Sequence, residues 1–548
     1  MSTESNNLDA IIVGAGLSGL YALYQLKERG FTALVLEAGS GVGGTWYWNR
    51  YPGARCDVES LQYSYSFSKE LRQDWTWSEL YGGQPEILSY INFVADRFDL
   101  RKDIKFNTRV ASALFSDKNN TWSVRTEQGD VFTAIYCIMA TGCLSVPYEP
   151  EYPGLGDYQG DLYHTGRWPH EDIDFTSMRV GVIGTGATAI QLIPVVAEQV
   201  DHLTVFQRTA NYSIPGHNKP ADPVADQKFE NNFPARHDKA RHSFAGMSGY
   251  SSPRLSALDE EPKERNRYFE ERWNSGGGTF AMLTTYRDLL VNREANELAA
   301  EFVREKIHSI VDNPEVAELL TPRNQPIGAK RLPVDTFYFE SYNRDNVSLV
   351  DIKNTPIECI TPNGLRTSIK AYEFDALILA TGFDAMTGAL LAMNIRREEG
   401  STLEEIWSEG PKSYLGIMVS GFPNMFTITG PGSPSVKMNM IYAIEQHVEW
   451  VVDCIDHLRS RDLDRIEPTK SAQEDWVEHA REVAEATLMP EADSWYVGAN
   501  IPGKPRVFMP YFGGFERYWK LCEEIVDDGY RGFDLSGPHN IRANMTGC

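Results

Sequence analysis

Two glycine-rich motifs constrain the fold of this chain more than any other feature. The first reads Gly14-Ala-Gly16-Leu-Ser-Gly19, and the second, about 170 residues later, reads Gly184-Thr-Gly186-Ala-Thr-Ala189. Each follows a short apolar run and precedes a helix-compatible segment, which is the order strand, tight turn and helix. In that order the motif places the phosphates of a dinucleotide at a helix N-terminus, where free N–H groups favour anions. The chain is therefore predicted to hold two dinucleotides.

The two motifs differ in the residue that ends the next strand. Glu37 ends the strand after the first motif, and a carboxylate there accepts hydrogen bonds from ribose hydroxyls. The equivalent position after the second motif is Gln207, followed by Arg208. Arginine beside a neutral amide attracts a 2′-phosphate, unless Arg208 is only a solvated surface residue. We therefore expect FAD at the first motif and NADPH at the second, bound by Gly14, Gly16, Gly19 and Glu37 and by Gly184, Thr185, Gly186, Arg208 and Thr209, respectively.

The sequence predicts an α/β protein with two Rossmann-like dinucleotide-binding domains. Strands that end in Ala140-Thr-Gly142 and Ala380-Thr-Gly382 are expected to mark the points where the chain crosses between them. Residues 260–273 and 294–307 read as amphipathic helices, so we expect a helical insertion in the NADPH-binding domain. The expected boundaries are 1–145 and 381–548 for the FAD-binding domain, 146–215 and 330–380 for the NADPH-binding domain, and 216–329 for the insertion.

Charge and cysteine content exclude several classes of function. The net charge of −24 argues against binding to nucleic acid or to anionic membranes, which require basic surfaces. No apolar run approaches the ~20 residues of a membrane span, and neither end resembles a targeting signal, so we expect a cytoplasmic protein. The seven cysteines form no close pair, which argues against a metal site and against a reductase that works through a redox disulfide.

The linker before the second motif carries a longer pattern. It contains Gly160, His164 and Trp168-Pro169, and a histidine in such a loop is by itself most simply a hydrogen-bonded structural residue. The complete spacing, however, resembles the fingerprint Phe-x-Gly-x-x-x-His-x-x-x-Trp-Pro/Asp of type I Baeyer–Villiger monooxygenases, with Tyr158 in place of the usual Phe. The tryptophan distinguishes this family from flavin-containing and N-hydroxylating monooxygenases.

The resemblance covers nearly the whole chain and is strongest to the cyclohexanone-, phenylacetone- and steroid-type members. The segments that carry it, besides the linker, are Gly43–Asp57, Lys330-Arg331, Gly430–Ser435 and Ser494–Lys504. It implies that NADPH reduces FAD, that O2 then forms a C4a-peroxyflavin, and that this species attacks a ketone. The tetrahedral adduct would rearrange to an ester or lactone, and sulfides would also be oxidised. No protein partner is implied.

The resemblance also assigns roles to individual residues. Arg331 would be the catalytic cation that stabilises the developing anions, and Asp57 would hold it. Lys330 would contact the 2′-phosphate, while Gly160, His164 and Trp168 would couple domain motion to the state of the cofactors. Trp495 and Asn500 match a lid near residues 490–505. Further contacts to FAD are expected from Gly44, Thr45, Trp46, Trp48, Asp57, Tyr63 and Val110, and the substrate pocket is expected to include Ser435, Lys437 and Met440.

Lys437 departs from the family pattern, in which an apolar residue is commoner at this position. Two interpretations are open. The ammonium group can recognise a carboxylate or another polar group of the substrate, or the side chain can simply extend its charge to water. We favour the second interpretation. Two alternatives to the family function are an S- or N-oxygenating flavin monooxygenase and a non-catalytic sensor that binds FAD and NADPH.

Overall fold

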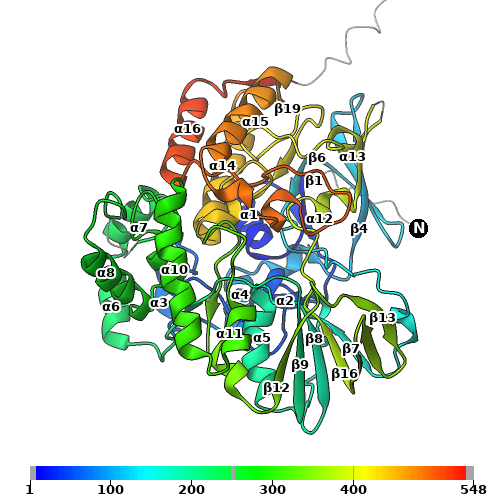
Figure 1. The fold of residues 1–548 in the computed structure, drawn as a ribbon. Coiled ribbons are helices and arrows are strands. Elements are labelled where there is room, and N and C mark those ends of the chain that lie inside the picture. The colour runs from blue at the N-terminus through cyan, green and yellow to red at the C-terminus, as the bar shows by residue number, and fades with distance from the viewer. Residues whose placement is uncertain (1–7, 249–252, 399, 538–548) are drawn as a thin grey trace, which may run out of the picture.

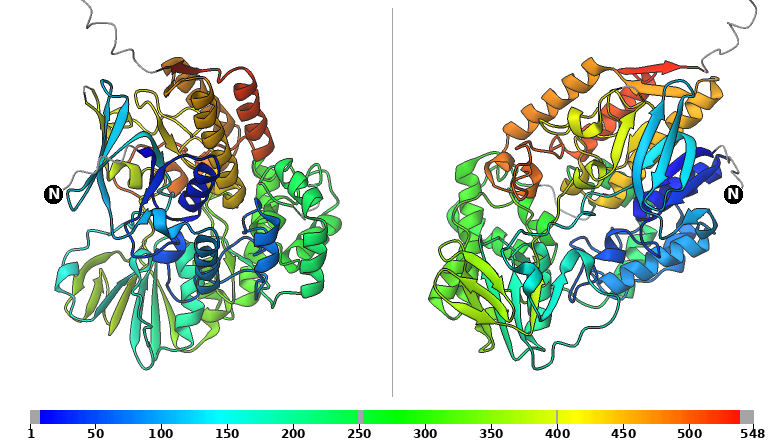
Figure 2. Two further views of the ribbon diagram at one scale, coloured as in Figure 1. Left: turned by 180° about the vertical axis from the view of Figure 1, so that it is seen from behind. Right: turned by 90° about the vertical axis from the view of Figure 1, so that its right-hand side faces the viewer.

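The computed structural model describes residues 8–248, 253–398 and 400–537 (Figure 1). The two ends of the chain, in which we found no targeting signal, lie outside the described residues. Two β-sheets form the framework, and helices cover them and fill the space beside them (Figures 1 and 2).

The first sheet contains the strand that leads into the first glycine motif. Its strand order is β17-β4-β5-β6-β1-β2-β3, and β18 pairs with β6. Helices α1 and α14 pack against one another, and their apolar side chains share one buried core with β1. The bounds are β1 (Leu8–Val13), α1 (Leu17–Glu28), β2 (Ala33–Leu36), β3 (Ile104–Lys105), β4 (Val110–Ser116), β5 (Thr121–Thr126), β6 (Val131–Met139), β17 (Asn394–Arg397), β18 (Met425–Thr427) and α14 (Met440–Ser460). Segments from both halves of the chain therefore build this sheet.

The second sheet contains the strand that leads into the second glycine motif. Its strands are all parallel and run in the order β12-β9-β8-β16-β7. A small antiparallel sheet, β13-β14-β15, accompanies it. The bounds are β7 (Asp161–His164), β8 (Arg179–Ile183), α5 (Ala187–Ala197), β9 (His202–Gln207), β12 (Val347–Asp351), β13 (Ile357–Thr361), β14 (Gly364–Thr367), β15 (Ala371–Glu373) and β16 (Ala376–Leu379).

A helical segment separates the strands of the second sheet along the chain. Strands β10 and β11 pair in parallel at its two ends. The two amphipathic helices predicted from the sequence are α8 and α10, and α10 buries Phe302, Val303 and Ile307 in the same core as the second sheet. The bounds are β10 (Ile214–Pro215), α6 (Pro223–Asn231), α7 (Phe233–Arg241), α8 (Pro262–Asn274), α9 (Gly278–Leu283), α10 (Arg293–Ile310), α11 (Pro314–Leu320) and β11 (Val334–Asp335).

The remaining elements surround the first sheet and its helices. They are α2 (Thr45–Trp48), α3 (Lys69–Asp74), α4 (Gln84–Arg97), α12 (Gly388–Leu391), α13 (Leu403–Ile406), β19 (Arg465–Pro468), α15 (Lys470–Glu485), α16 (Phe515–Asp527) and β20 (Phe533–Ser536), with short 3-10 turns at η5 (Ser435–Lys437) and η7 (Trp495–Val497). The predicted α/β class with two dinucleotide-binding sheets is confirmed. The domain boundaries given above stay predictions.

Three properties of the described residues bear on function. No helix among them is both long and apolar enough to cross a membrane. The cysteines that fall within the described ranges are free thiols. No group of three or more His, Cys, Asp or Glu side chains in those ranges is arranged to hold a metal ion.

Candidate functional site

A large cavity lies between the two sheets. Its volume is about 2290 Å³, and both glycine motifs line it. Pockets for one small ligand typically measure about 300–1,000 Å³. The cavity therefore has room for more than one large ligand.

The first glycine of each motif is placed against one of the two Ala-Thr-Gly turns. Gly14 has φ +105° and Gly184 has φ +119°, values that disfavour any residue with a side chain. A Cβ atom on Gly14 would lie 2.6 Å from the carbonyl oxygen of Ala140, and one on Gly184 would lie 2.4 Å from that of Ala380. A Cβ on Gly186, by contrast, would meet nothing within 4 Å, since this glycine faces the open cavity. The first glycine is thus placed in the same way in both motifs.

Glu37 occupies a more constrained position than the sequence indicated. Its Oε2 accepts a hydrogen bond from the amide of Ala15 at 2.6 Å, and its Oε1 accepts one from the amide of Gly39 at 2.6 Å. Burial raises the pKa of Glu37, although these backbone bonds oppose the shift. The carboxylate lines the cavity while it also fixes the turn of the first motif.

Two cations face the cavity beside the second motif. Arg208 and Lys330 both line it, and neither forms an ion pair with any described residue. Burial and the charge of Arg208 lower the pKa of Lys330, against the effect of Asp493. Two close cations without an ion-pair partner provide a site for a phosphate group. Gln207 does not line this site, because its amide donates to the carbonyl oxygen of Leu319.

The proposed catalytic pair is in contact. The Nε and Nη2 atoms of Arg331 lie 3.1 and 2.7 Å from Oδ2 of Asp57. The other carboxylate oxygen, Oδ1, accepts from the side-chain amide of Gln191 at 3.3 Å. Burial would lower the pKa of Arg331, but Asp57 outweighs that effect and the pKa is raised. The guanidinium is therefore a permanent, oriented positive charge in the cavity wall.

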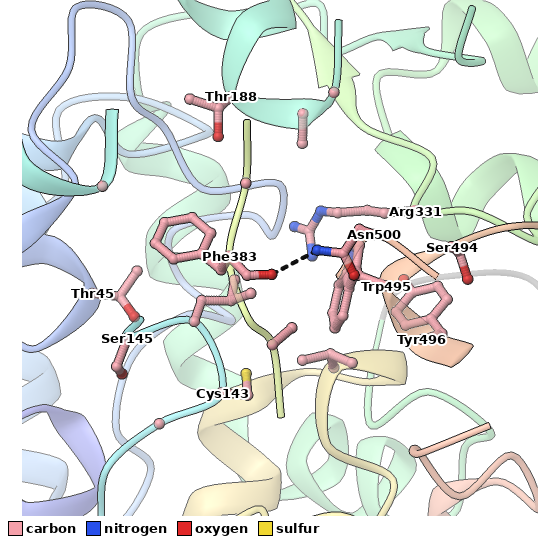
Figure 3. Close-up of a pocket in the computed structure, with 18 of the residues that line it drawn as sticks. Thr45, Cys143, Ser145, Thr188, Arg331, Phe383, Ser494, Trp495, Tyr496 and Asn500 are labelled. Atoms are coloured by element: carbon pink, nitrogen blue, oxygen red, sulfur yellow. Dashed lines mark hydrogen bonds between the residues drawn. The ribbon is translucent and has the colours of Figure 1, made fainter. Parts of the chain in front are cut away.

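The predicted lid reaches the same part of the cavity. Figure 3 shows Arg331, Trp495 and Asn500 close together near Phe383. The Nδ2 atom of Asn500 donates to the carbonyl oxygen of Phe383 at 2.7 Å. The Oδ1 atom of Asn500 and the Oγ atom of Ser494 are buried without a hydrogen-bond partner. These orphaned acceptors suit a ligand that carries amide or hydroxyl donors.

The three predicted linker residues, Gly160, His164 and Trp168, lie outside the cavity lining, although Gly166 and Arg167 of the same linker are part of it. Nδ1 of His164 accepts from the amide of Gly166 at 3.0 Å, so its Nε2–H donates, at 3.1 Å to the carbonyl oxygen of Tyr148 and at 3.2 Å to Oγ1 of Thr381. Burial lowers the pKa of His164. Trp168 is buried against Tyr163, and a Cβ on Gly160 would lie 2.7 Å from the carbonyl oxygen of Asp375. His164 thus ties the linker to the second Ala-Thr-Gly turn.

The predicted substrate loop faces the cavity only in part. Lys437 and Met440 line the cavity, together with Val436 and Met438. Ser435 does not line the cavity, because its side chain is fully buried. Its hydroxyl group has no hydrogen-bond partner. The side chain of Lys437, which we had expected to extend its charge to water, is half-buried in the cavity wall. Its ammonium lies 4.1 Å from the centre of the Tyr496 ring.

The other predicted contacts to the first dinucleotide also face the cavity. Trp46 donates from its indole nitrogen to the hydroxyl of Tyr63 at 3.1 Å, which fixes both rings. Gly19 is the exception, since it does not line the cavity and instead packs tightly against the backbone of Gly14. The lining includes Gly14, Gly16, Glu37, Gly44, Thr45, Trp46, Trp48, Asp57, Tyr63 and Val110 on the first side and Gly184, Thr185, Gly186, Arg208, Thr209, Lys330, Trp495 and Asn500 on the second.

Comparison with known proteins identifies the family. A family model described as pyridine nucleotide-disulphide oxidoreductase matches residues 11–233. A Baeyer-Villiger monooxygenase from Pseudooceanicola batsensis is 42% identical over 530 residues, which are 96% of this chain and 96% of that protein. The chain belongs to the Baeyer–Villiger monooxygenases.

Solved structures of relatives agree with this Baeyer–Villiger assignment. Oxidized steroid monooxygenase bound to NADP matches with a TM-score of 0.93 at 49% identity, over 97% of this chain and 100% of that one. A complex of OTEMO with FAD and NADP matches with a TM-score of 0.93 at 40% identity, over 96% and 99% of the two chains. The residues of the present cavity fit both cofactors. The cavity is large, the cations Arg208 and Lys330 have no ion-pair partner among the described residues, and the predicted lid carries acceptors without a hydrogen-bond partner.

Three residues of this Baeyer–Villiger site escaped the sequence analysis. Gln191 holds the second oxygen of Asp57, and Tyr496 and Phe512 lie beside the ammonium of Lys437. Tyr496 directly follows the predicted lid residue Trp495, so the adjacent position was a usable signal. No local sequence pattern marked Gln191 or Phe512, since only the tertiary fold brings these residues to the site.

We expect the lid of this Baeyer–Villiger enzyme to depend on Lys504. Its ammonium pairs with Asp384 and donates to the carbonyl oxygen of Ala385 at 2.8 Å, which ties the lid to the turn after Gly382. Lys504→Met should raise the Kd for NADP+ about tenfold or more, because the half-buried carboxylate of Asp384 loses its buried partner and the predicted lid loses its anchor. Fluorescence titration with NADP+ measures this effect.

The control is Lys520→Met in α16. Lys520 is exposed and pairs with Glu516 on the same helix, and neither residue lines the cavity, so its loss should change the Kd little. Equal Kd values for wild type and Lys504→Met would show that Lys504 does not anchor the lid.

Proposed function

We propose that this enzyme uses NADPH and O2 to convert ketones to esters or lactones. Ketones of the cyclic, aryl-aliphatic and steroid-like types are the proposed substrates, and sulfides are proposed as a second substrate class. The observation that carries the proposal is the Arg331–Asp57 pair in the wall of a cavity that both glycine motifs share. In the overall reaction, ketone, O2, NADPH and a proton give ester, NADP+ and water.

When bound, NADPH supplies the hydride and FAD supplies the activation of oxygen. The protein supplies position and charge. Gly14, Glu37 and the aromatic residues of α2 would hold FAD, while Arg208 and Lys330 would hold the 2′-phosphate of NADPH. These two cations lie on the side of the cavity that the second glycine motif lines. Arg331 is therefore not needed for the phosphate and is free to act on the ketone.

Arg331 would stabilise the negative charge that develops on the ketone oxygen when the carbonyl carbon is attacked. A fixed guanidinium serves this role because it cannot lose its proton and needs no reorganisation during the reaction. Asp57 and Gln191 orient it, since each oxygen of Asp57 has its own partner. The lid residues Trp495 and Asn500 would close over the cavity and exclude water.

The test is conversion of a ketone under 18O2. Purified holoenzyme with NADPH and cyclohexanone or phenylacetone should give an ester or lactone that carries one 18O atom, with one NADPH consumed for each product molecule. Mass spectrometry measures the label. Oxidation of sulfides with no ester from any ketone would instead support an S- or N-oxygenating enzyme. Failure to consume NADPH with any substrate would support a non-catalytic sensor.

A further inference from the structure

The side chain of Lys437 is half-buried in the wall of the cavity, and its ammonium group has no anion beside it among the described residues. The ammonium lies 4.1 Å from the centre of the Tyr496 ring and 5.5 Å from that of Phe512. No described residue forms an ion pair or a hydrogen bond with it. Burial and the positive charge of Arg331 lower the pKa of Lys437 to about 7. The cavity therefore holds two neighbouring cations, of which only Arg331 has a protein carboxylate beside it.

Such an arrangement is costly unless a ligand compensates for it. An ammonium group that is withdrawn from water loses part of its solvation. The two aromatic faces recover only some of this loss. An apolar residue would fill the same space without the penalty. A cation that faces a substrate cavity under these conditions marks a place where an anionic group binds.

The phosphates of NADPH are not the anion in question. Their expected partners, Arg208 and Lys330, influence one another and lie with Asp493 on the wall of the second motif. Lys437 is instead influenced by Arg331, which is the residue proposed to act on the ketone. Its neighbours Val436, Met438 and Met440 are apolar. The anion that meets Lys437 must therefore belong to the molecule whose carbonyl group meets Arg331.

We propose that Lys437 binds a carboxylate on the substrate, so that this enzyme acts on ketones that carry a carboxylate group. This inference rests on the proposed Baeyer–Villiger function. The carboxylate takes no part in the reaction: the anionic oxo acid, O2, NADPH and a proton give an ester that still carries the carboxylate, together with NADP+ and water. The contact to Lys437 would orient the ketone toward Arg331.

The proposal is tested with a matched pair of substrates, 3-oxocyclohexanecarboxylate and its methyl ester. The ratio of their kcat/KM values, acid over ester, is measured for the holoenzyme and for Lys437→Met. A charge-assisted hydrogen bond contributes about 1.5–3 kcal/mol, so the ratio should fall roughly 10- to 100-fold in the variant, mainly through the KM of the acid. Lys437→Arg, which keeps the charge, should retain most of the ratio.

The control variant is Lys412→Met. Lys412 is exposed and pairs with Glu409, so its removal should leave the ratio unchanged. An equal change of both kcat/KM values in Lys437→Met would overturn the proposal and show that Lys437 only packs against the two rings. A rise in the Kd of NADPH in that variant, with the acid-to-ester ratio preserved, would also overturn it and assign Lys437 to the cofactor.

A binding measurement separates this proposal from the function on which it rests. Calorimetric titration of the NADP+-bound holoenzyme with the oxo acid needs no turnover. Wild type should bind the acid and take up protons at pH 8, since a carboxylate raises the pKa of the amine that it meets. The groups that face this amine are Arg331, with its partner Asp57, and the phenol of Tyr496.

The outcomes of the titration are distinct. The anion site is supported if wild type binds the acid with proton uptake and Lys437→Met shows neither binding nor uptake. This result would hold even if no ester is ever formed. Ester formation from neutral ketones without binding of the acid would overturn the anion site and leave the proposed function intact.

Discussion

Replacing Arg331 with alanine is expected to lower the rate of ester formation by about 10²–10³-fold while NADPH is still consumed. The guanidinium faces the cavity and is held by Asp57 through Nε and Nη2. Without it, no fixed positive charge would meet the oxygen that becomes negative during attack on the ketone. Because the residues proposed to bind the cofactors remain, reducing equivalents should appear as hydrogen peroxide instead of ester. Parallel assays of NADPH, peroxide and ester measure this change.

Two further variants test whether the loss of ester formation comes from the loss of the guanidinium group. Arg331→Lys keeps the charge but cannot form both contacts to Asp57, so an intermediate rate is expected. Arg366→Ala removes an exposed arginine that pairs with Glu358 far from the cavity lining, and it should leave the ester yield unchanged. Normal ester formation by Arg331→Ala would remove this residue from the chemistry. Loss of bound FAD in that variant would instead indicate a structural role.

The second large effect is expected from the double variant Arg208→Ala/Lys330→Ala. The two cations line the cavity beside the second motif and have no ion-pair partner among the described residues. If each donates to the 2′-phosphate, the KM for NADPH should rise by roughly 10²- to 10⁴-fold, since each of the two bonds contributes about 1.5–3 kcal/mol. The KM for NADH, which lacks this phosphate, should change little. Steady-state kinetics with both nucleotides measure the difference.

The contrast between the two nucleotides makes the result specific. Equal increases of both KM values would show that the two residues do not recognise the phosphate. Raising the ionic strength should weaken NADPH binding in wild type more than in the double variant, because the partly exposed charges are screened by salt.

The sequence predicted the parts of the site that depend on local geometry. Gly14 and Gly184 follow a strand and precede a helix, and that order alone indicates a phosphate-binding turn. The pairing of Arg331 with Asp57 came from the family resemblance, and the structure places the two side chains in contact. Their residue numbers differ by 274, so no periodicity or spacing could have predicted the contact.

The remaining features depend on tertiary contacts that no local pattern records. The environment of Lys437 is set by Tyr496 and Phe512, which come from later segments of the chain. Ser435 adopts a φ of +39° and turns into the core, a conformation that is uncommon for a residue with a side chain. Sequence reasoning could not tell which side chains of this loop face the cavity and which face the core.

The contacts of Asp57 have a consequence for the stiffness of the site. Asp57 follows the first glycine motif, but its neighbours Tyr51 and Ala54 pack in the same apolar core as the second sheet. The side-chain amide of Gln191 in α5 donates to the carbonyl oxygen of Arg55 and to Oδ1 of Asp57. Leu332, next to Arg331, belongs to that core as well. We therefore expect the guanidinium to keep its direction whichever ligand fills the cavity, because its anion is built into the same packed unit.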